Sequence, residues 1–162
     1  MKIRNIIEKC AAFFVVSVLT AAVIGCGKAE TESISGEKED MQTEIKDKNL
    51  IMLINGNEIP LIWEDNPSVE ALKKMAADRP EIQMTRYGGF EQVGPFGRPI
   101  ACDDENMKTS PGDVVLYEGN HIVIFYKGSE WSYTRLGKID LSENEIVELL
   151  ENEDVTLVLE LS

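Results

Sequence analysis

The sequence predicts a mainly β fold: a closed β-barrel of about eight strands, with two short helices that cap its ends. Three observations lead to this prediction. About seven short apolar runs are separated by turn residues, only two segments carry helix signals, and no internal repeat is present. All of these signals lie within residues 50–162, which we therefore assign to one folded domain.

The domain begins with a predicted β-hairpin. Residues 50–54 and residues 58–63 are both apolar runs, and Asn55-Gly56 lies between them. Asn-Gly is the strongest short-range hairpin signal because both residues tolerate the positive φ of a tight turn.

A helix and a strand are expected next. Asn66 is a good N-cap, and Pro67 suits the first helical position because its missing N–H is not needed there. The helix is expected to run until Arg79-Pro80, and residues 81–86 then look like a strand. One face of the helix carries Val69, Leu72 and Ala76.

The middle of the domain, residues 87–112, is expected to be a long loop because glycine and proline are frequent in it. A loop of this length inside a compact domain is more often functional than idle. Strands are expected to follow at residues 114–117, 121–126 and 131–139.

The C-terminal part predicts a second helix and a last strand. Ser142 and Glu145 form a capping box, in which each side chain satisfies a backbone N–H of the other residue. Leu141 and Ile146 can pack together across this helix start as a hydrophobic staple. Residues 155–161 form the closing strand.

The N-terminal residues have the pattern of a secretory signal. Lys2, Arg4 and Lys9 precede an apolar run over residues 10–24 that is short for a lasting transmembrane helix. The run ends in VIGC (residues 23–26), which resembles the bacterial lipobox. This resemblance implies a lipoprotein signal peptide at residues 1–25 and a lipid with acyl chains such as palmitate on Cys26.

Such a lipoprotein would be anchored in the cell membrane and would face outside the cytoplasm, in the cell envelope. The alternative is a plain N-terminal membrane anchor with an incidental cysteine. Residues 26–49 are expected to be a disordered acidic tether, because they contain no aromatic residue and few large apolar ones. A transient helix near residues 41–48 is the alternative for that segment.

Charge and cysteine content limit the partners. The chain has 16 basic and 29 acidic residues, with a net charge of −13, which disfavours nucleic acid as a partner. Three cysteines are too few for a disulfide scaffold. We expect a monomer with no cofactor and no metal; the expected partners are the membrane, through Cys26, and a peptide or small-molecule ligand.

Three segments of the domain resemble a known family. They are YGGF at residues 87–90, PGDVVL at residues 111–116 and LGKI at residues 136–139. They resemble, in this order, segments of cyclophilins, and the longer runs GGFEQVGPFGRPIA, GDVVLYEGNHIVIFY and WSYTRLGKI are similar to the small bacterial cyclophilin-like domain family. The resemblance covers residues 50–162 and implies the cyclophilin-like barrel with its two capping helices.

Cyclophilins are peptidyl-prolyl isomerases, so the resemblance also raises the question of activity. Isomerisation needs an apolar cleft and a donor to the prolyl nitrogen, and an arginine is suited to the second task. Arg86 is the candidate catalytic residue, the alternative being an ion pair with a surface acid. Tyr87 stands where cyclophilins have a glutamine, and their long loop is missing between Tyr126 and Tyr133.

Candidate ligand-binding residues come from the aromatic content of the domain. Each aromatic side chain is either part of a pocket or part of the core, and the sequence leaves both open. The candidates, together with one glutamine, are Tyr87, Phe90, Gln92, Phe96, Phe125, Trp131 and Tyr133.

Three other features favour ordinary structural roles. His121 has no surrounding ligand cluster, residues 103–105 lack the spacing of a calcium loop, and Cys102 has no neighbouring activator. Two functions therefore remain: a membrane-anchored domain that binds a peptide or small ligand, or a weak prolyl isomerase that assists folding of secreted proteins. The first is favoured because the isomerase residue set is incomplete.

Overall fold

The computed structural model describes residue 45 and residues 47–162. The predicted signal peptide, the lipidation site Cys26 and residues 27–44 of the predicted tether lie outside the described residues. The backbones of Asn49 and Ser162 exchange two hydrogen bonds of 3.2 and 3.1 Å, so strand-like pairing starts one residue before the predicted boundary.

Four strands form the first antiparallel sheet, in the order β2-β1-β11-β4. The predicted hairpin turn is confirmed: Ile54 pairs with Asn57 across it, and Asn55 and Gly56 have positive φ values of 50° and 79°. The second arm is shorter than predicted, because only Asn57–Glu58 pairs with β1, and Leu61–Trp63 pairs with residues 137–139 of the other sheet. The strands are β1 (Leu50–Ile54), β2 (Asn57–Glu58), β4 (Glu81–Gln83) and β11 (Thr156–Leu161).

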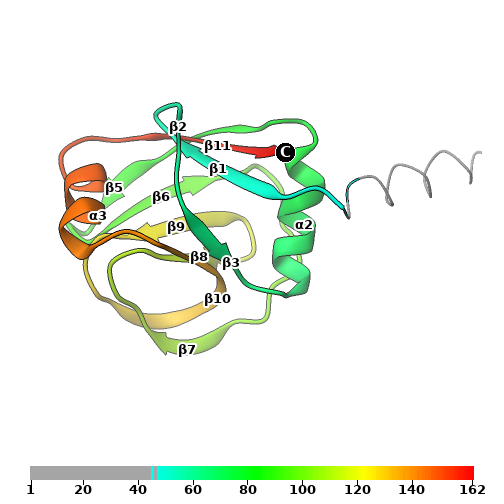
Figure 1. Cartoon of the computed structure of the whole chain (residues 1–162). Coiled ribbons are helices and arrows are strands. Elements are labelled where there is room, and N and C mark those ends of the chain that lie inside the picture. Colours follow the sequence, from blue (N-terminus) through cyan, green and yellow to red (C-terminus); the bar gives the residue numbers. More distant parts are fainter. Residues whose placement is uncertain (1–44, 46) are drawn as a thin grey trace, which may run out of the picture. The chain divides into compact units, whose positions relative to one another are not determined.

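The second sheet has seven strands. Six of them follow the order β3-β10-β8-β9-β6-β5, and β7 pairs with the N-terminal half of the long strand β10 (Figure 1). The strands are β3 (Leu61–Trp63), β5 (Thr85–Tyr87), β6 (Glu91–Pro95), β7 (Glu105–Lys108), β8 (Asp113–Tyr117), β9 (His121–Phe125) and β10 (Glu130–Ile139).

The predicted closed barrel of about eight strands is wrong in its closure and its strand count. Eleven strands form two separate sheets, and no ladder joins the sheets within residues 47–162. Pro60, which has no N–H to donate, follows β2 and separates it from β3. On the other side, β6 passes closely over β4: a Cβ on Gly94 would lie 2.5 Å from Met84 Sδ and 2.7 Å from Ile82 Cγ2. The sheets therefore meet by side-chain packing and by a hydrogen bond of 2.8 Å from the Trp63 indole to the Leu50 carbonyl, and no backbone ladder between them is present in residues 47–162.

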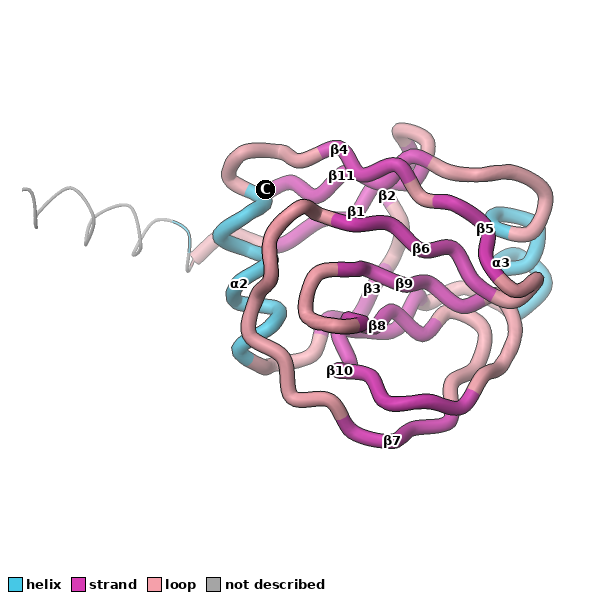
Figure 2. Tube along the Cα trace, turned by 180° about the vertical axis from the view of Figure 1, so that it is seen from behind, coloured by secondary structure: helices cyan, strands magenta, loops and turns pink. Residues whose placement is uncertain are grey.

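Two helices lie at opposite ends of the domain, as predicted (Figures 1 and 2). The helix α2 (Pro67–Ala76) starts at Asn66, whose side chain accepts a 3.0 Å hydrogen bond from the Val69 N–H. It ends at Ala76, before the predicted Arg79. The helix α3 (Glu143–Leu150) begins with the capping box predicted at Ser142 and Glu145.

The main core lies between the two sheets and includes Met52, Leu72, Ile124 and Leu157. Alternate residues of β8 and β9 face the other side of the seven-stranded sheet, since successive side chains of a strand point to opposite faces. There they form a second buried group, which we call the outer cluster. It consists of Val115, Val123, Phe125 and Tyr133.

Candidate functional site

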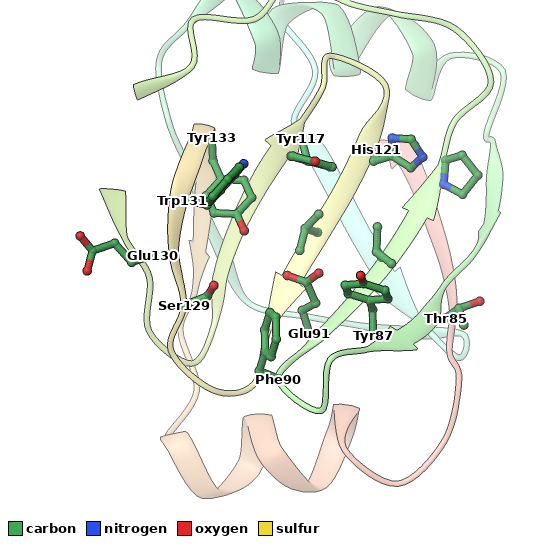
Figure 3. Close-up of a pocket in the computed structure, with 13 residues that line it drawn as sticks. Thr85, Tyr87, Phe90, Glu91, Tyr117, His121, Ser129, Glu130, Trp131 and Tyr133 are labelled. Atoms are coloured by element: carbon green, nitrogen blue, oxygen red, sulfur yellow. The ribbon is translucent and has the colours of Figure 1, made fainter. Parts of the chain in front are cut away.

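A pocket of about 620 Å³ opens over the outer cluster, on the face of the seven-stranded sheet opposite the main core. Strand pairing explains its floor, because Val93 pairs with Val123, and Val123 pairs with Val115, on three neighbouring strands. The long strand β10 supplies one wall (Figure 3). The lining residues are Thr85, Tyr87, Phe90, Glu91, Val93, Pro95, Tyr117, His121, Val123, Ser129, Glu130, Trp131 and Tyr133.

Five aromatic side chains line the pocket: Tyr87, Phe90, Tyr117, Trp131 and Tyr133. Phe90 stacks parallel to Phe125 with ring centroids 6.3 Å apart. Phe125 and Tyr117 each meet Tyr133 edge to face, at 5.5 and 5.9 Å. These contacts connect the rings of β8, β9 and β10, so the wall is preorganised by packing. Trp131 is 60 % exposed at the rim.

The turn between β5 and β6 positions Phe90 and Glu91. Gly88 and Gly89 have φ values of 61° and 75°, in the left-handed region that favours glycine. A Cβ on Gly88 would overlap the Phe90 ring, so this ring position requires glycine there. The tight turn also pairs Tyr87 with Glu91.

Glu91 is the polar centre of the pocket. Its side chain comes from the start of β6 and points into the pocket between Phe90 and Tyr87 (Figure 3). Only 7 % of the residue is exposed, and its Oε2 has no hydrogen-bond partner in the described part of the chain. Burial raises the pKa of Glu91 from 4.5 to about 7. A carboxyl group of this kind is half ionised at neutral pH, without a protein cation to stabilise the charge.

Asp113, a buried carboxylate in the same sheet, differs from Glu91 in its hydrogen bonds and in the direction of its pKa shift. Its Oδ1 accepts hydrogen bonds from Arg135 at 2.9 Å and Lys138 at 3.0 Å, and its Oδ2 accepts one from the Ser110 N–H at 2.7 Å. Burial raises the pKa of Asp113, but the hydrogen bonds from Lys138 and Ser110 and the two positive charges outweigh it and leave the pKa lowered. Asp113 is fully satisfied by the protein, whereas Glu91 is not.

Other polar groups complete the pocket. His121 is half-buried, its ring lies 6.3 Å from that of Tyr117, and its Nδ1 is buried without a hydrogen-bond partner. A hydrogen bond with the Glu118 carboxylate raises the pKa of Tyr117, and burial raises the pKa of Tyr133. Both phenols are therefore neutral at physiological pH, and their hydroxyl groups already have hydrogen-bond partners in Glu118 and Ser129.

Four of the predicted ligand-binding residues line this pocket, and a fifth packs directly behind it. Tyr87, Phe90, Trp131 and Tyr133 are the lining residues. Phe125 is fully buried between Phe90 and Tyr133, so it supports the wall without facing the opening.

Arg86 lies outside the pocket, on the other side of β5 from Tyr87. Its backbone N–H and its Nε approach Asp154 Oδ1 at 3.0 and 3.6 Å, and its Nη1 donates to the Glu151 carbonyl at 3.1 Å. The expected grouping of Arg86 with Tyr87 and Phe90 is therefore not formed, because adjacent residues of a strand face opposite sides. Arg86 instead forms an ion pair with a surface acid, Asp154, which was the alternative to a catalytic role.

Gln92 and Phe96 also lie elsewhere. The Gln92 side chain is fully buried, and its Nε2 donates to the carbonyl oxygens of Leu150 and Glu153, both at 2.7 Å. It thus holds the C-terminal end of α3. Phe96 packs against the main core. Both positions serve the fold.

Sequence reasoning missed Glu91 and His121 as pocket residues. Residues 87–112 were expected to be a loop, but they contain β6 and β7. The missed signal is the alternation Glu91, Val93, Pro95, which places all three residues on one face of a strand. His121 was expected to be an ordinary strand residue, and it does begin β9, but it also faces the pocket.

Among the described residues, no group of three or more His, Cys, Asp or Glu side chains is arranged to hold a metal ion. The acidic residue Asp104 accepts a 2.6 Å hydrogen bond from the Thr134 hydroxyl group. Cys102 is a free, exposed cysteine.

Comparison with known proteins agrees with the resemblance seen in the sequence. The sequence profile described as the Cyclophilin-like family matches residues 52–160, which is more than half of the chain and nearly all of the described domain. No curated protein and no solved structure gives a significant match. On the strength of the profile match and of a mainly β fold with two capping helices, the chain belongs to the Cyclophilin-like family.

Proposed function

We propose that this cyclophilin-like domain binds a peptide or a small ligand in the pocket over the outer cluster. One observation carries the proposal: a buried carboxyl group, Glu91, lines an aromatic pocket and has an oxygen without a partner in residues 47–162. Leaving a buried polar atom unsatisfied costs about 1–3 kcal/mol, so such an atom in a pocket favours a ligand that supplies the missing hydrogen bond.

The lining favours binding over prolyl isomerisation. Isomerisation requires a donor to the prolyl nitrogen, and an arginine at the cleft is suited to that task. None of the residues that line the pocket is Arg or Lys, and Arg86 contacts Asp154 and Glu151 instead. We therefore propose a binding domain and treat isomerase activity as the outcome that would contradict it.

We further propose that the chain is a lipoprotein, anchored in the membrane through Cys26 and facing outside the cytoplasm. The support is the basic N-terminus, the apolar run of residues 10–24 and the lipobox-like VIGC at residues 23–26. Among the described residues, no helix has the length and apolar character needed to cross a membrane.

The binding proposal is tested with three probes that share one ring and differ in charge: benzylammonium, benzamide and benzoate. The full chain, purified in detergent, is titrated with each probe and followed by NMR. We expect at least one probe to shift the indole N–H signal of Trp131, which lies at the pocket rim. The absence of any shift at millimolar concentrations, or efficient isomerisation of a proline peptide by the same preparation, would contradict the proposal.

A further inference from the structure

The surroundings of Glu91 restrict the chemistry of the ligand, provided that the pocket binds one as proposed. An ionised carboxylate accepts hydrogen bonds and donates none. Glu91 Oε2 has no donor among the residues that the structure describes, and the pocket lining contains no Arg or Lys. A second acid, Glu130, is exposed and also lines the pocket. The ionised form of Glu91 therefore favours a ligand that brings both hydrogen-bond donors and positive charge.

The aromatic rings around Glu91 favour the same kind of group. The face of an aromatic ring carries partial negative charge and attracts cations within about 6 Å. Figure 3 shows the Glu91 carboxylate among rings that come from three different strands, β5, β8 and β10, and from the turn before β6. These rings belong to Tyr87, Phe90, Tyr117, Trp131 and Tyr133. An ammonium group has three donors and no acceptor, and an apolar stem behind it would contact Val93 and Val123 on the floor.

We infer that this pocket binds a protonated amine on an apolar stem, with the ammonium group hydrogen-bonded to Glu91 and enclosed by the aromatic rings. The amine belongs either to a free small molecule or to a lysine side chain of a peptide. The chemistry at Glu91 is the same in both cases, and the experiment below separates the two sources.

This inference makes the affinity depend on pH with a defined sign. The ammonium group binds the ionised form of Glu91, and burial raises the pKa of Glu91 in the empty pocket to about 7. Affinity for an amine should therefore rise about tenfold per pH unit below pH 7 and become constant above about pH 8. A ligand that accepts a hydrogen bond from protonated Glu91 would show the opposite trend. The other titratable groups that line the pocket are Tyr87, Tyr117, His121, Glu130 and Tyr133.

The test is calorimetric titration of the full chain in detergent with benzylammonium, benzamide, benzoate and N-acetyl-lysine methylamide, between about pH 5.5 and pH 8.5. We expect an ammonium probe to bind at least about tenfold more tightly than benzamide or benzoate at the upper end of this range. Tighter binding of N-acetyl-lysine methylamide identifies a peptide side chain as the source, and tighter binding of benzylammonium identifies a free amine.

Matched variants assign the effect to Glu91. Glu91→Gln keeps the size of the side chain and removes its charge, so it should lower the affinity for the ammonium probe roughly tenfold or more at high pH and abolish the pH dependence. Glu130→Gln removes an exposed carboxylate from the same pocket and should cost less than about threefold. His121→Gln should leave the pH dependence of the affinity for the ammonium probe unchanged. Unfolding curves of the variants confirm that they are folded.

Two results separate this inference from the proposed function. If benzamide or benzoate binds as tightly as the ammonium probes, or if Glu91→Gln leaves ammonium binding unchanged, the inference is wrong and the binding function stands. If none of the four probes binds, the proposed function itself is contradicted.

Discussion

Glu91 and Gln92 are neighbours in the sequence and face opposite sides of the seven-stranded sheet. Glu91 lines the pocket, where its Oε2 has no partner among the described residues. Gln92 is buried on the other side, where its Nε2 donates two 2.7 Å hydrogen bonds to the carbonyl oxygens of Leu150 and Glu153 and its Oε1 is also without a partner among these residues. Two adjacent residues of β6 thus have different roles: Glu91 can contact a ligand, and Gln92 holds the end of α3. This separation allows function and stability to be tested independently.

Glu91→Gln should stabilise the protein at high pH. Below about pH 4.5 the Glu91 carboxyl is protonated in both the folded and the unfolded chain, so it has no effect on the pH dependence. Between 4.5 and about 7 the folded chain holds this proton more tightly, so wild-type stability falls as pH rises and the loss is complete above that range.

The full shift corresponds to about 3 kcal/mol, and the opening of the pocket to solvent reduces our expectation to about 2 kcal/mol. Urea unfolding of wild type and Glu91→Gln should therefore give similar free energies near pH 5 and a more stable variant near pH 8. Equal free energies of unfolding for the two proteins near pH 8 would show that burial of the ionised Glu91 carboxylate does not destabilise the fold.

Gln92→Leu should destabilise the fold by about 2–3 kcal/mol. The substitution removes both hydrogen bonds to the carbonyl oxygens at the end of α3 and leaves these acceptors without a donor. Gln83→Leu, on the exposed side of β4, is the matched control and should change stability by less than about 0.5 kcal/mol. Urea unfolding measures both, and a loss at Gln92 no larger than the control would contradict this role.

Arg86→Ala should leave ligand binding unchanged and reduce stability by less than about 1 kcal/mol. Its ion pair with Asp154 is exposed and 3.6 Å long, and such pairs contribute little. Titration with benzylammonium and urea unfolding give the two readouts. Lost binding in a stable variant would instead support the catalytic or binding role that the sequence suggested for Arg86.

Cys26→Ser should prevent lipidation. Serine has no thiol to carry the thioether-linked lipid, so the variant should appear in the soluble fraction or accumulate as an unprocessed precursor. Mass spectrometry and membrane fractionation measure the outcome. A variant with wild-type mass and wild-type membrane association would mean that the N-terminal residues act as a plain anchor.

Local signals in the sequence predicted most of the fold. The Asn55-Gly56 hairpin, the Asn66 cap and the capping box of Ser142 and Glu145 depend on neighbouring residues only, and all three are confirmed. Barrel closure was predicted wrongly because it depends on contacts between distant segments. The close approach at Gly94, for example, brings β4 and β6 together without a ladder.

The site was predicted in part for the same reason. Aromatic residues can be chosen as pocket candidates from residue type alone, and four of the aromatic residues predicted here line the pocket. The face of the sheet on which a residue lies depends on the strand to which it belongs and on its position in that strand. Because glycine and proline are frequent in residues 87–112, this segment was predicted as a loop, and no face could be assigned to its residues. Arg86 and Gln92 were therefore assigned to the site, and Glu91, which lies between Phe90 and Gln92 in the sequence, was not.

Fluorescence of the two tryptophans tests most directly whether the pocket over the outer cluster is the ligand site. Trp131 lies at the pocket rim, whereas the Trp63 indole donates a 2.8 Å hydrogen bond to the Leu50 carbonyl at the first sheet. The full chain, Trp63→Phe and Trp131→Phe are titrated with benzylammonium. The account predicts a saturable change in emission for wild type and for Trp63→Phe, and no change for Trp131→Phe. A saturable change that persists in Trp131→Phe and disappears in Trp63→Phe would place the ligand elsewhere and contradict it.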